Sequence, residues 1–302
     1  MRAAYGDRAT VVSCTPSVYA TSHPITDVIV RTDDGRRVAL LHKDVATFLP
    51  GAAAAKPSFL RDARRESLVY RELLAGIDVG APHLVGAGDG WLLLEKVAGV
   101  ELYQVGDLGV WRTVAQELAA MHRAFERTAD RDAAARSLRL LRHDAASVDA
   151  WMARACSALT GSPSQRWGQG LRSRYGDVRD RILSLPQTIV HGDLYASNVL
   201  VSDVTEPVRR VCPIDWEMAA TGPGLVDLAA LVAGAWPEQE RRTIADGYLE
   251  QFPSLEVDDL EVCRLHLAVQ WLGWSPGWNA PPEHAHSWLA EAQELSERLG
   301  LT

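Results

Sequence analysis

Three oxygen-bearing side chains near the middle of the 302-residue chain have the types and spacing that phosphoryl transfer requires. A His191-Gly192-Asp193 triplet is followed five residues later by Asn198, and Asp215 ends a short apolar run. A carboxylate can take or orient the proton of an attacking hydroxyl, while amide and carboxylate oxygens can hold Mg²⁺ against nucleotide phosphates. The pattern therefore predicts that Asp193 is catalytic and that Asn198 and Asp215 bind the metal.

Each of these residues also has a simpler interpretation when it is taken alone. A loop aspartate commonly caps a turn, and a lone histidine in such a turn usually serves the backbone. Asp227, which opens a predicted helix, either caps that helix or holds the loop of Asp193. Glu217 is equally compatible with a supporting partner, a substrate contact and a surface acid. The combination of His191, Asp193 and Asp215 with Asn198 favours catalysis over the simpler alternatives.

A lysine upstream supplies the cation that nucleotide phosphates need. The chain has only three lysines, Lys43, Lys56 and Lys96, and Lys43 ends a predicted strand. We expect Lys43 to bind the α- and β-phosphates and a helix carboxylate to align it. Glu66 and Glu72 are six residues apart and so lie on different helix faces. Glu66 is the predicted partner because Glu72 lies nearer the end of the helix.

The first hundred residues predict a small β-rich region. Alternating β-branched residues predict a strand over 24–32, and the Asp33-Asp34-Gly35 turn returns the chain as a second strand over 36–43. A helix is expected over about 58–75, ended by Gly76. Two further strands are expected over 83–88 and 91–97.

The remainder of the chain predicts a larger, mainly helical region. Apolar residues recur at three- and four-residue spacing over about 107–127, which indicates an amphipathic helix. Short apolar runs within 187–217 predict strands around the Asp193 loop. Further helices are expected over 146–160, 168–185, 225–235, 238–250, 256–273 and 282–299. The change of character predicts an N-terminal unit of residues 1–97 and a C-terminal unit of residues 98–302.

Composition limits the class of protein. A net charge of −8 argues against a nucleic-acid partner, and 47% apolar residues describe an ordinary globular chain. No run approaches the roughly 20 apolar residues of a membrane span. The four cysteines have no paired spacing, and the N-terminus lacks the apolar core of a signal peptide. These features predict a cytoplasmic protein that does not associate with membranes.

The sequence resembles the aminoglycoside phosphotransferase and choline kinase-like family of small-molecule kinases. The resemblance is carried by Val190–Leu194, Asn198 and Ile214-Asp215-Trp216-Glu217, with His-Gly-Asp in place of the His-Arg-Asp of protein kinases. It implies an α+β, protein-kinase-like bilobal fold with a small β-rich N-lobe and a larger, mainly helical C-lobe. It also implies ATP, or GTP as the alternative, together with Mg²⁺ as cofactor and a small-molecule hydroxyl as acceptor.

The same resemblance implies further contacts to the nucleotide. Lys43 and Glu66 match the phosphate-binding lysine and its helix partner. The segment Leu92–Gly99, with Glu95 and Val97, resembles the connection between the lobes, whose backbone meets the adenine. Residues 14–23 contain no glycine where a phosphate-covering loop is expected, so Ser22 is the candidate there through its backbone and hydroxyl.

The acceptor site is predicted among the C-terminal residues, where tryptophans cluster. Trp271 and Trp278 are candidate substrate contacts, although paired tryptophans at helical spacing most often pack in a core. Glu217 and Glu283 are the acidic candidates. The cluster departs from the acid-rich helices expected for aminoglycoside enzymes.

The most favoured function is therefore an ATP-dependent phosphotransferase acting on a hydroxyl of an aminoglycoside-type antibiotic, an amino sugar or a related metabolite. A kinase for an antibiotic would confer antibiotic resistance, and a choline-type amine would require an aromatic cage. The alternative is a catalytically retired, kinase-like module that binds a nucleotide or a partner. A metal-dependent hydrolase is a more distant possibility. The chain is expected to be a monomer or a homodimer.

Overall fold

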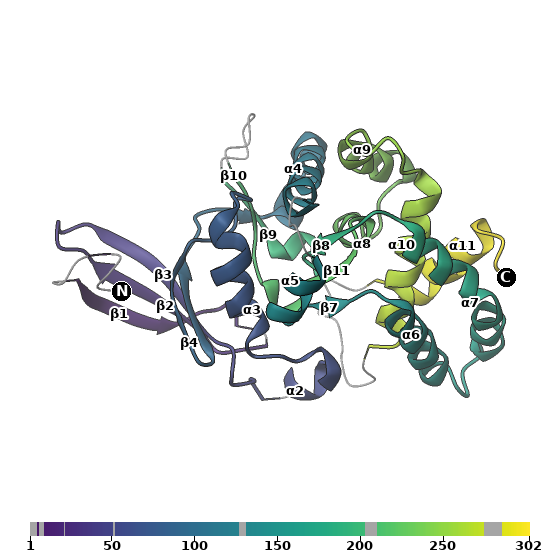
Figure 1. Cartoon of the computed structure of the whole chain (residues 1–302), viewed down its shortest axis with the longest axis horizontal. Helices are drawn as coiled ribbons and strands as arrows, with labels where there is room; N and C mark the ends of the chain where they lie inside the picture. The colour runs from purple at the N-terminus through teal and green to yellow at the C-terminus, as the bar shows by residue number, and fades with distance from the viewer. Residues whose placement is uncertain are drawn as a thin grey trace.

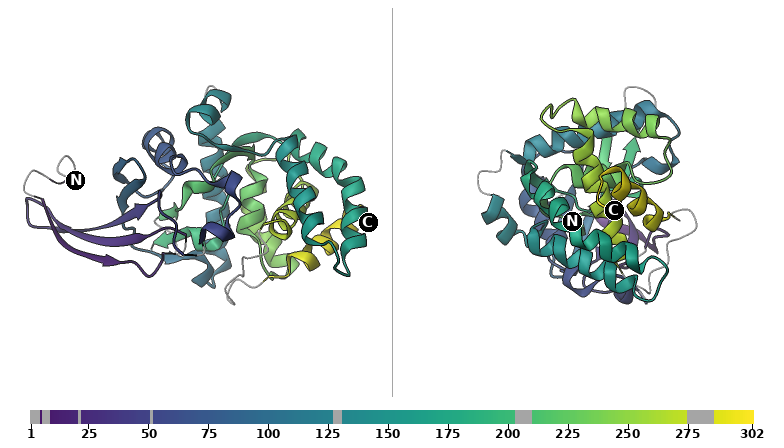
Figure 2. Two further views of the ribbon diagram at one scale, coloured as in Figure 1. Left: turned by 90° about the horizontal axis from the view of Figure 1, so that it is seen from below. Right: turned by 90° about the vertical axis from the view of Figure 1, so that its right-hand side faces the viewer.

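An N-terminal antiparallel sheet is followed by a mainly helical region along the long axis of the molecule (Figure 1). The structure, a computed structural model, describes residues 5, 9–20, 22–50, 52–126, 131–202, 210–274 and 286–302. The N-terminal strands lie at one end and the C-terminal helices at the other (Figure 2). This is the protein-kinase-like architecture that the sequence predicts. The division between residues 97 and 98 stays a prediction.

The N-terminal sheet has five strands in the order β1-β2-β3-β5-β4, and every neighbouring pair is antiparallel. The strands are β1 (Thr10–Pro16), β2 (Ile25–Arg31), β3 (Arg37–Asp44), β4 (Leu84–Gly88) and β5 (Trp91–Glu95). The four predicted strands are confirmed. Strand β1 was not predicted, because all seven of its residues are exposed and its sequence carries no buried face.

The helical segment between β3 and β4 is less regular than predicted. The α-helix α3 covers only Arg65–Leu68, with 3-10 turns before and after it at Ser58–Leu60 and Leu74–Gly76, and a π-helical turn at Val69–Leu73. The break arises because Arg61 is extended and the Asp62 carboxylate accepts the Arg64 N–H at 3.0 Å. The predicted end at Gly76 is confirmed, but the predicted start at residue 58 is wrong.

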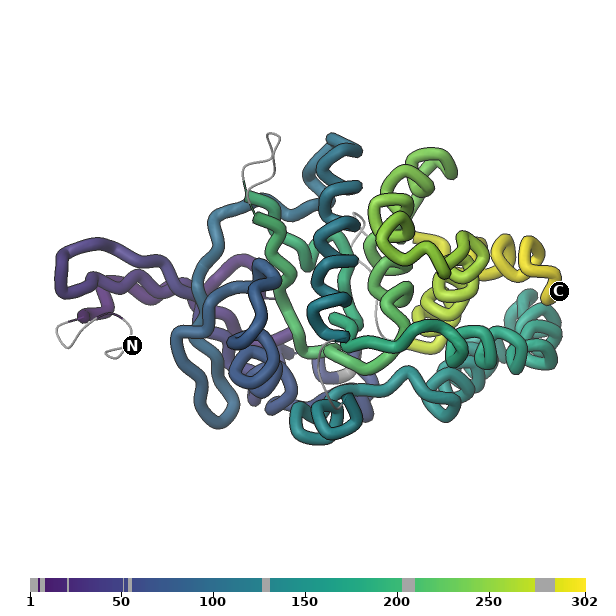
Figure 3. The backbone as a smooth tube through the Cα atoms, turned by 45° about the horizontal axis from the view of Figure 1, so that its top comes forward, coloured from purple at the N-terminus to yellow at the C-terminus, as the bar shows by residue number. Residues whose placement is uncertain are grey.

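The helical region packs around two central helices. Helix α4 packs against α9, and α10 packs against α6, α8 and α11 (Figure 3). The helices are α4 (Leu108–Glu126), α5 (Arg131–Ser137), α6 (Ala145–Ala158), α7 (Gln165–Ser184), α8 (Leu225–Leu231), α9 (Glu238–Leu249), α10 (Val257–Leu272) and α11 (Trp288–Arg298). All were predicted except α5, a short polar helix that buries only Ala135. The predicted start of the last helix, at 282, lies outside the described residues.

Two small sheets carry the predicted catalytic loop. The motif strands β8 (Gln187–Val190), β9 (Val199–Ser202) and β10 (Arg210–Pro213) were expected. They pair with three short strands that were not expected. The strand order is β10-β9-β6 in one sheet and β7-β11-β8 in the other. The unexpected strands are β6 (Val100–Glu101), β7 (Leu141–Arg142) and β11 (Ala220–Pro223). Strand β11 pairs with β8, so the chain on both sides of the loop is fixed to the sheets.

One hydrophobic core connects the two regions. Val69 and Leu92 of the N-terminal region belong to the same buried cluster as Val199 and Trp216 beside the motif. Because this core is continuous, it fixes the position of the N-terminal region relative to the helical region. Side chains that meet from the two regions are therefore held in place. None of the described helices is both long and apolar enough to cross a membrane.

Candidate active site

The His191-Gly192-Asp193 loop depends on a glycine at its centre. Gly192 has a φ of +80°, which L side chains rarely adopt, and a Cβ there would lie 2.2 Å from the Met218 carbonyl oxygen. An arginine at this position, as in protein kinases, would require a different path for the backbone. The loop therefore passes close to the segment after Asp215, and this brings the two halves of the motif together.

Asp227 anchors the same loop from helix α8. Its buried carboxylate accepts the backbone N–H of His191 at 2.7 Å and that of Gly192 at 2.8 Å. His122 contacts it at 3.1 Å and is itself 2.9 Å from the Tyr248 hydroxyl. Burial alone would raise the pKa of Asp227, but the bond from His122 outweighs burial and keeps that pKa below its usual range. Of the two predicted roles, the structure favours holding the loop over capping the helix.

His191 has the structural role that the sequence favours. Burial lowers the pKa of its imidazole, so the ring is neutral. Its Nε2 donates to the Ile214 carbonyl oxygen at 2.8 Å, and its Nδ1 accepts the Asp193 N–H at 3.3 Å. The ring thus connects the Asp193 loop to the strand end that carries Asp215.

Asp193 is held by Asn198 in an environment that favours its protonated form. The Asn198 Nδ2 donates to the Asp193 Oδ2 at 3.1 Å and to the Asp193 carbonyl oxygen at 2.8 Å. Burial, followed by the charge of Asp215, raises the pKa of Asp193 to about 7. A carboxyl group with a pKa near neutrality is suited to accepting a proton from a hydroxyl.

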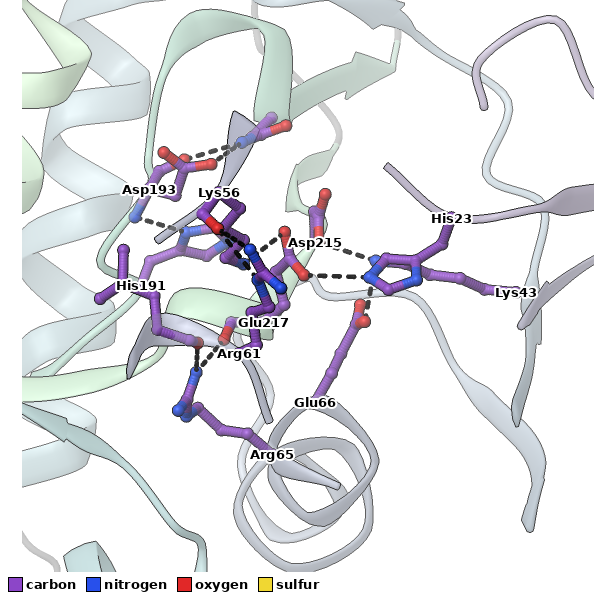
Figure 4. Close-up of polar contacts among 12 residues, drawn as sticks. His23, Lys43, Lys56, Arg61, Arg65, Glu66, His191, Asp193, Asp215 and Glu217 are labelled. Atoms are coloured by element: carbon purple, nitrogen blue, oxygen red, sulfur yellow. Dashed lines mark hydrogen bonds and ion pairs between the residues drawn. The ribbon is translucent and has the colours of Figure 1, made fainter. Parts of the chain in front are cut away.

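Asp215 is one of two described non-glycine residues with a positive φ, at φ 64° and ψ 65°. Aspartate tolerates this left-handed conformation better than most residues. The conformation directs Oδ1 to the Lys43 Nζ at 2.7 Å (Figure 4). The side chain that the sequence predicts as a metal ligand therefore meets the lysine predicted to bind phosphate.

Lys43 also pairs with Glu66, at 2.8 Å, from helix α3. Burial would lower the pKa of Lys43, but the charges of Asp215 and Glu66 outweigh burial and hold that pKa above its usual value. Glu72 instead pairs with Arg71 at 3.3 Å on the surface. The structure thus brings Lys43 together with the glutamate that the sequence favoured.

The residues predicted to bind metal fit a magnesium ion. Among the described residues, no three His, Cys, Asp or Glu side chains gather at one point. Mg²⁺ does not need such a cluster, because it usually takes one or two protein ligands, waters and substrate phosphates. Asn198 uses Nδ2 for both of its bonds to Asp193, which leaves the amide oxygen for a cation. Asp215 supplies the carboxylate.

Glu217 lies in an ion network rather than against the candidate acceptor cavity. Its carboxylate is 2.9 Å from the Lys56 Nζ and 3.5 Å from the His23 Nε2. Burial would raise the pKa of Glu217, but His23 and Lys56 outweigh burial and hold that pKa well below its usual range. Neither Lys56 nor His23 is a site residue that the sequence predicts. The scarcity of lysine was a signal that could have drawn attention to Lys56.

The other predicted nucleotide contacts lie along the sheet and the loop before it. Glu95 ends β5, pairs with Arg210 at 2.8 Å and accepts the His83 N–H at 3.1 Å. Because the Glu95 side chain is engaged there, the predicted contact to an adenine would fall to the backbone of this segment, which includes the half-buried Val97. Ser22 lies in the loop between β1 and β2, and its carbonyl oxygen accepts the Leu49 N–H at 3.0 Å.

A cavity of about 270 Å³ adjoins Asp193. Its wall is rich in aromatic side chains, and it includes Phe59, Trp151, Tyr195, Trp271 and Trp274. Trp271 was a predicted substrate contact, and its indole N–H donates to the hydroxyl of Tyr195 in the Asp193 loop. The other two predicted contacts, Trp278 and Glu283, lie outside the described residues. Trp151 was missed because it is 120 residues from the nearest of the other cavity tryptophans in the sequence, Trp271.

Arg65 joins the elements around the site through backbone carbonyls. This side chain is buried and donates to the oxygens of Leu60 at 3.0 Å, Arg139 at 2.8 Å and Glu217 at 2.6 Å. Lysine has a single ammonium and cannot reproduce this planar fork of donors. Arg65→Lys should lower the free energy of unfolding by about 2 kcal/mol in denaturant titration. The exposed Arg64→Lys is the control, and equal stability of the two variants would contradict this role.

A protein-kinase-like fold with a lysine, an Asp–Asn loop and a second aspartate around one cleft defines a phosphotransferase. The chain belongs to the phosphotransferase enzyme family APH, whose model matches residues 26–266. It is a small-molecule kinase of that family, which uses a nucleoside triphosphate. A search of curated proteins found no significant match.

Solved structures of this family share the fold at low sequence identity. The choline kinase LicA from Streptococcus pneumoniae is 17% identical, with a TM-score of 0.62 over 97% of this chain and 94% of LicA. The macrolide 2′-phosphotransferase MphH from Brachybacterium faecium is 18% identical, with a TM-score of 0.60 over 90% and 88%. A GDP complex of an aminoglycoside 2′-phosphotransferase variant is 14% identical, with a TM-score of 0.61 over 98% and 94%. These similarities extend to the whole fold and leave the acceptor open.

Proposed function

We propose that the chain transfers the γ-phosphoryl group of ATP, with Mg²⁺, to a hydroxyl of a small ring-bearing acceptor such as a sugar or an amino sugar. The observation that carries this proposal is the position of Asp193. It lies between the Lys43–Asp215 pair, whose side chains suit nucleotide phosphates, and the aromatic cavity. GTP is the alternative donor.

In this proposal each charged group has a separate task. Lys43, aligned by Glu66, binds the nucleotide phosphates, and Asn198 and Asp215 hold the magnesium ion, which neutralises phosphate charge when bound. Asp193 orients the acceptor hydroxyl and takes its proton. Because Asn198 and the Asp227-anchored backbone fix Asp193, the acceptor meets a preorganised group rather than a mobile one.

The cavity wall supports a ring-bearing acceptor over a polycation. Besides Asp193, the described lining contains a single acid, Asp144, and it also contains a cation, Arg142. An aminoglycoside with several ammonium groups would require more carboxylates than these. The tryptophans that line the cavity supply apolar aromatic surface, against which the C–H face of a sugar can pack.

The arrangement of the tryptophans also favours a wall over an aromatic cage. Trp151 and Trp274 stack on each other, with planes 1° apart and ring centroids 5.8 Å apart. Trp271 packs on Trp274 and stacks on Trp288 at centroid distances of 5.1 and 5.5 Å. Rings that pack on one another in this way form one continuous wall rather than the several facing walls of a cage, so a choline-type acceptor is less well supported.

An ATP-consumption screen tests this function. The purified chain with Mg²⁺ should consume ATP faster with some members of a panel of sugars, amino sugars and nucleosides than with water alone. Aminoglycosides and choline complete the panel. Stimulation of ATP consumption by the aminoglycosides alone would overturn the proposed acceptor class. Chemical conversion of a panel member in the absence of any nucleotide would overturn phosphotransfer.

The aromatic wall gives a prediction for the acceptor identified by that screen. Trp274→Ala should raise the KM for the acceptor about tenfold, because it removes aromatic surface from the cavity wall, a loss worth roughly 1 kcal/mol or more. The KM for ATP should not change, since Trp274 lies on the side of Asp193 away from Lys43. Trp274→Phe keeps an aromatic face and is the matched control. A change in the KM for ATP alone would contradict this assignment.

A further inference from the structure

A second lysine lies in the cleft, on the chain segment that connects β3 to α3. Lys56 is only 8% exposed, and its Nζ is 2.9 Å from Glu217. The Arg61 guanidinium donates from Nε to the Lys56 carbonyl oxygen at 2.9 Å, which fixes the backbone of Lys56 (Figure 4). Burying an ammonium group is costly, so a lysine held in this way needs a reason beyond solubility.

The two cleft lysines lie on different sides of the predicted path of the phosphoryl group. Lys43 pairs with Asp215 and Glu66, on the nucleotide side. Lys56 pairs with Glu217. Its positive charge also acts on Asp193, where it partly offsets the rise in pKa that burial and Asp215 cause. The same segment contributes Phe59 and Leu60 to the aromatic cavity. Lys56 therefore belongs to the chain segment that borders the acceptor cavity.

The chemistry of the site calls for a cation at that position. In phosphoryl transfer the negative charge spreads over three equatorial oxygens, and a cation beside them stabilises the transition state. Asp193, Asp215 and Glu217 all lie in the cleft (Figure 4), and negative charge on their carboxylates opposes the approach of a phosphate. Lys43 is already engaged by two carboxylates on the nucleotide side, which leaves the acceptor side to Lys56.

We propose that Lys56 is a further catalytic residue, whose ammonium group contacts the phosphoryl group during its transfer. This proposal rests on the proposed function. In the step, the acceptor oxygen forms a bond to the γ-phosphorus as the bond from phosphorus to the bridging oxygen breaks. The bridging oxygen leaves on ADP with the electron pair, and the hydroxyl proton passes to Asp193. Lys56 keeps its protons and offsets the charge on the equatorial oxygens.

Glu217 keeps a second partner when Lys56 turns toward the phosphoryl group. The His23 Nε2 is 3.5 Å from Glu217, and the His23 Nδ1 is 2.7 Å from the Thr47 carbonyl oxygen. Burial would lower the pKa of His23, but Glu217 outweighs burial and raises it. His23 therefore stays beside the carboxylate of Glu217, so Lys56 can leave without stripping that buried group of every partner.

Lys56→Met tests this role, with Mg²⁺-dependent hydrolysis of ATP by water as the readout because the acceptor is not yet identified. The rate should fall at least about 100-fold, the loss typical of removing one preorganised group from a transition state. The Kd for a fluorescent ATP analogue should change less than twofold. The control is Arg112→Met, which removes an ion pair to Glu250 that lies outside the cleft, and its hydrolysis rate should equal that of the wild type.

A double variant separates a catalytic lysine from a merely structural one. If Lys56 only neutralises Glu217, then Lys56→Met combined with Glu217→Gln should recover the hydrolysis rate of Glu217→Gln alone. If Lys56 acts on the phosphoryl group, the double variant stays as slow as Lys56→Met. The double variant carries neither buried charge, so it should fold even where Lys56→Met does not.

The two proposals fail in different ways. Wild-type hydrolysis no faster than that of Asp215→Asn would remove the proposed function itself. If the wild type hydrolyses ATP much faster than Asp215→Asn, and Lys56→Met hydrolyses it as fast as the wild type, only the catalytic role of Lys56 is ruled out. Recovery in the double variant would do the same.

Discussion

Asp193→Asn should lower kcat for the acceptor about 1,000-fold, the middle of the range for losing a general base. The Asn198 Nδ2 can still donate to the new amide oxygen, so the geometry of the loop should be kept. The Kd for ATP should change little, because Lys43 and Asp215 are untouched. Steady-state kinetics and a nucleotide titration measure both quantities.

The same substitution should stabilise the protein near neutral pH. The folded-state pKa of Asp193 is raised to about 7, so the folded chain binds a proton that the unfolded chain releases above its usual pKa of 3.8. The stabilising contribution of the protonated form is therefore lost as the pH rises toward 7. Replacing Asp193 by asparagine removes this loss, and Tm at pH 8 should rise by about 2 °C. A lower Tm together with full activity would contradict both the assigned role and its electrostatic basis.

Asp215→Asn has the second largest expected effect. It removes a carboxylate ligand for Mg²⁺ and one of the two acids that hold Lys43. We expect kcat to fall by about 100-fold or more, because the charge that neutralises the phosphates is weakened. The Mg²⁺ concentration needed for half-maximal activity should rise. A magnesium titration of ATP hydrolysis measures this shift.

The choice of asparagine separates chemistry from folding. Asp215 has a φ of 64°, and asparagine also adopts this left-handed conformation readily. Asp215→Ala should therefore unfold at lower denaturant concentration than Asp215→Asn, by about 1 kcal/mol or more. If the asparagine variant kept the wild-type magnesium dependence, Asp215 would not be the metal ligand.

The catalytic loop could be predicted because its chemistry is local in the sequence. Asp193 and Asn198 are five residues apart, and a short loop brings them within 3.1 Å. The preference for Glu66 over Glu72 relied on helix geometry, and the two residues do lie on different faces even though α3 is irregular. Periodicity likewise predicted the long amphipathic helix α4, because its buried residues recur along one face.

The residues that were missed are brought together by tertiary contacts alone. Lys56 and Glu217 are 161 residues apart in the sequence, and no local pattern around either residue indicates that their side chains pair. Trp151 joins Trp274 only because α6 packs against α10. Strand β1 carries no buried face, and strands β6 and β7 are only two residues long. The periodicity of apolar residues cannot reveal an exposed strand, a two-residue strand or a contact between distant residues.

Gly192 shows how one residue type can carry both structure and function. The sequence marks it as the difference from protein kinases, and the structure supplies a physical reason. With φ at +80° and the Met218 carbonyl beside it, the position has no room for a side chain. The backbone N–H of Gly192 is also one of the two that Asp227 holds. The glycine therefore allows the close approach on which the position of Asp193 depends.

Product analysis after incubation with ATP, Mg²⁺ and the acceptor panel decides whether the chain phosphorylates a hydroxyl group with the help of Asp193. Mass spectrometry should detect an acceptor that has gained one phosphoryl group with the wild-type chain, and ³¹P NMR should assign that group to a hydroxyl oxygen. The same product should be absent with Asp193→Asn at equal protein concentration. Equal amounts of product from the wild type and Asp193→Asn would show that Asp193 is not the catalytic base.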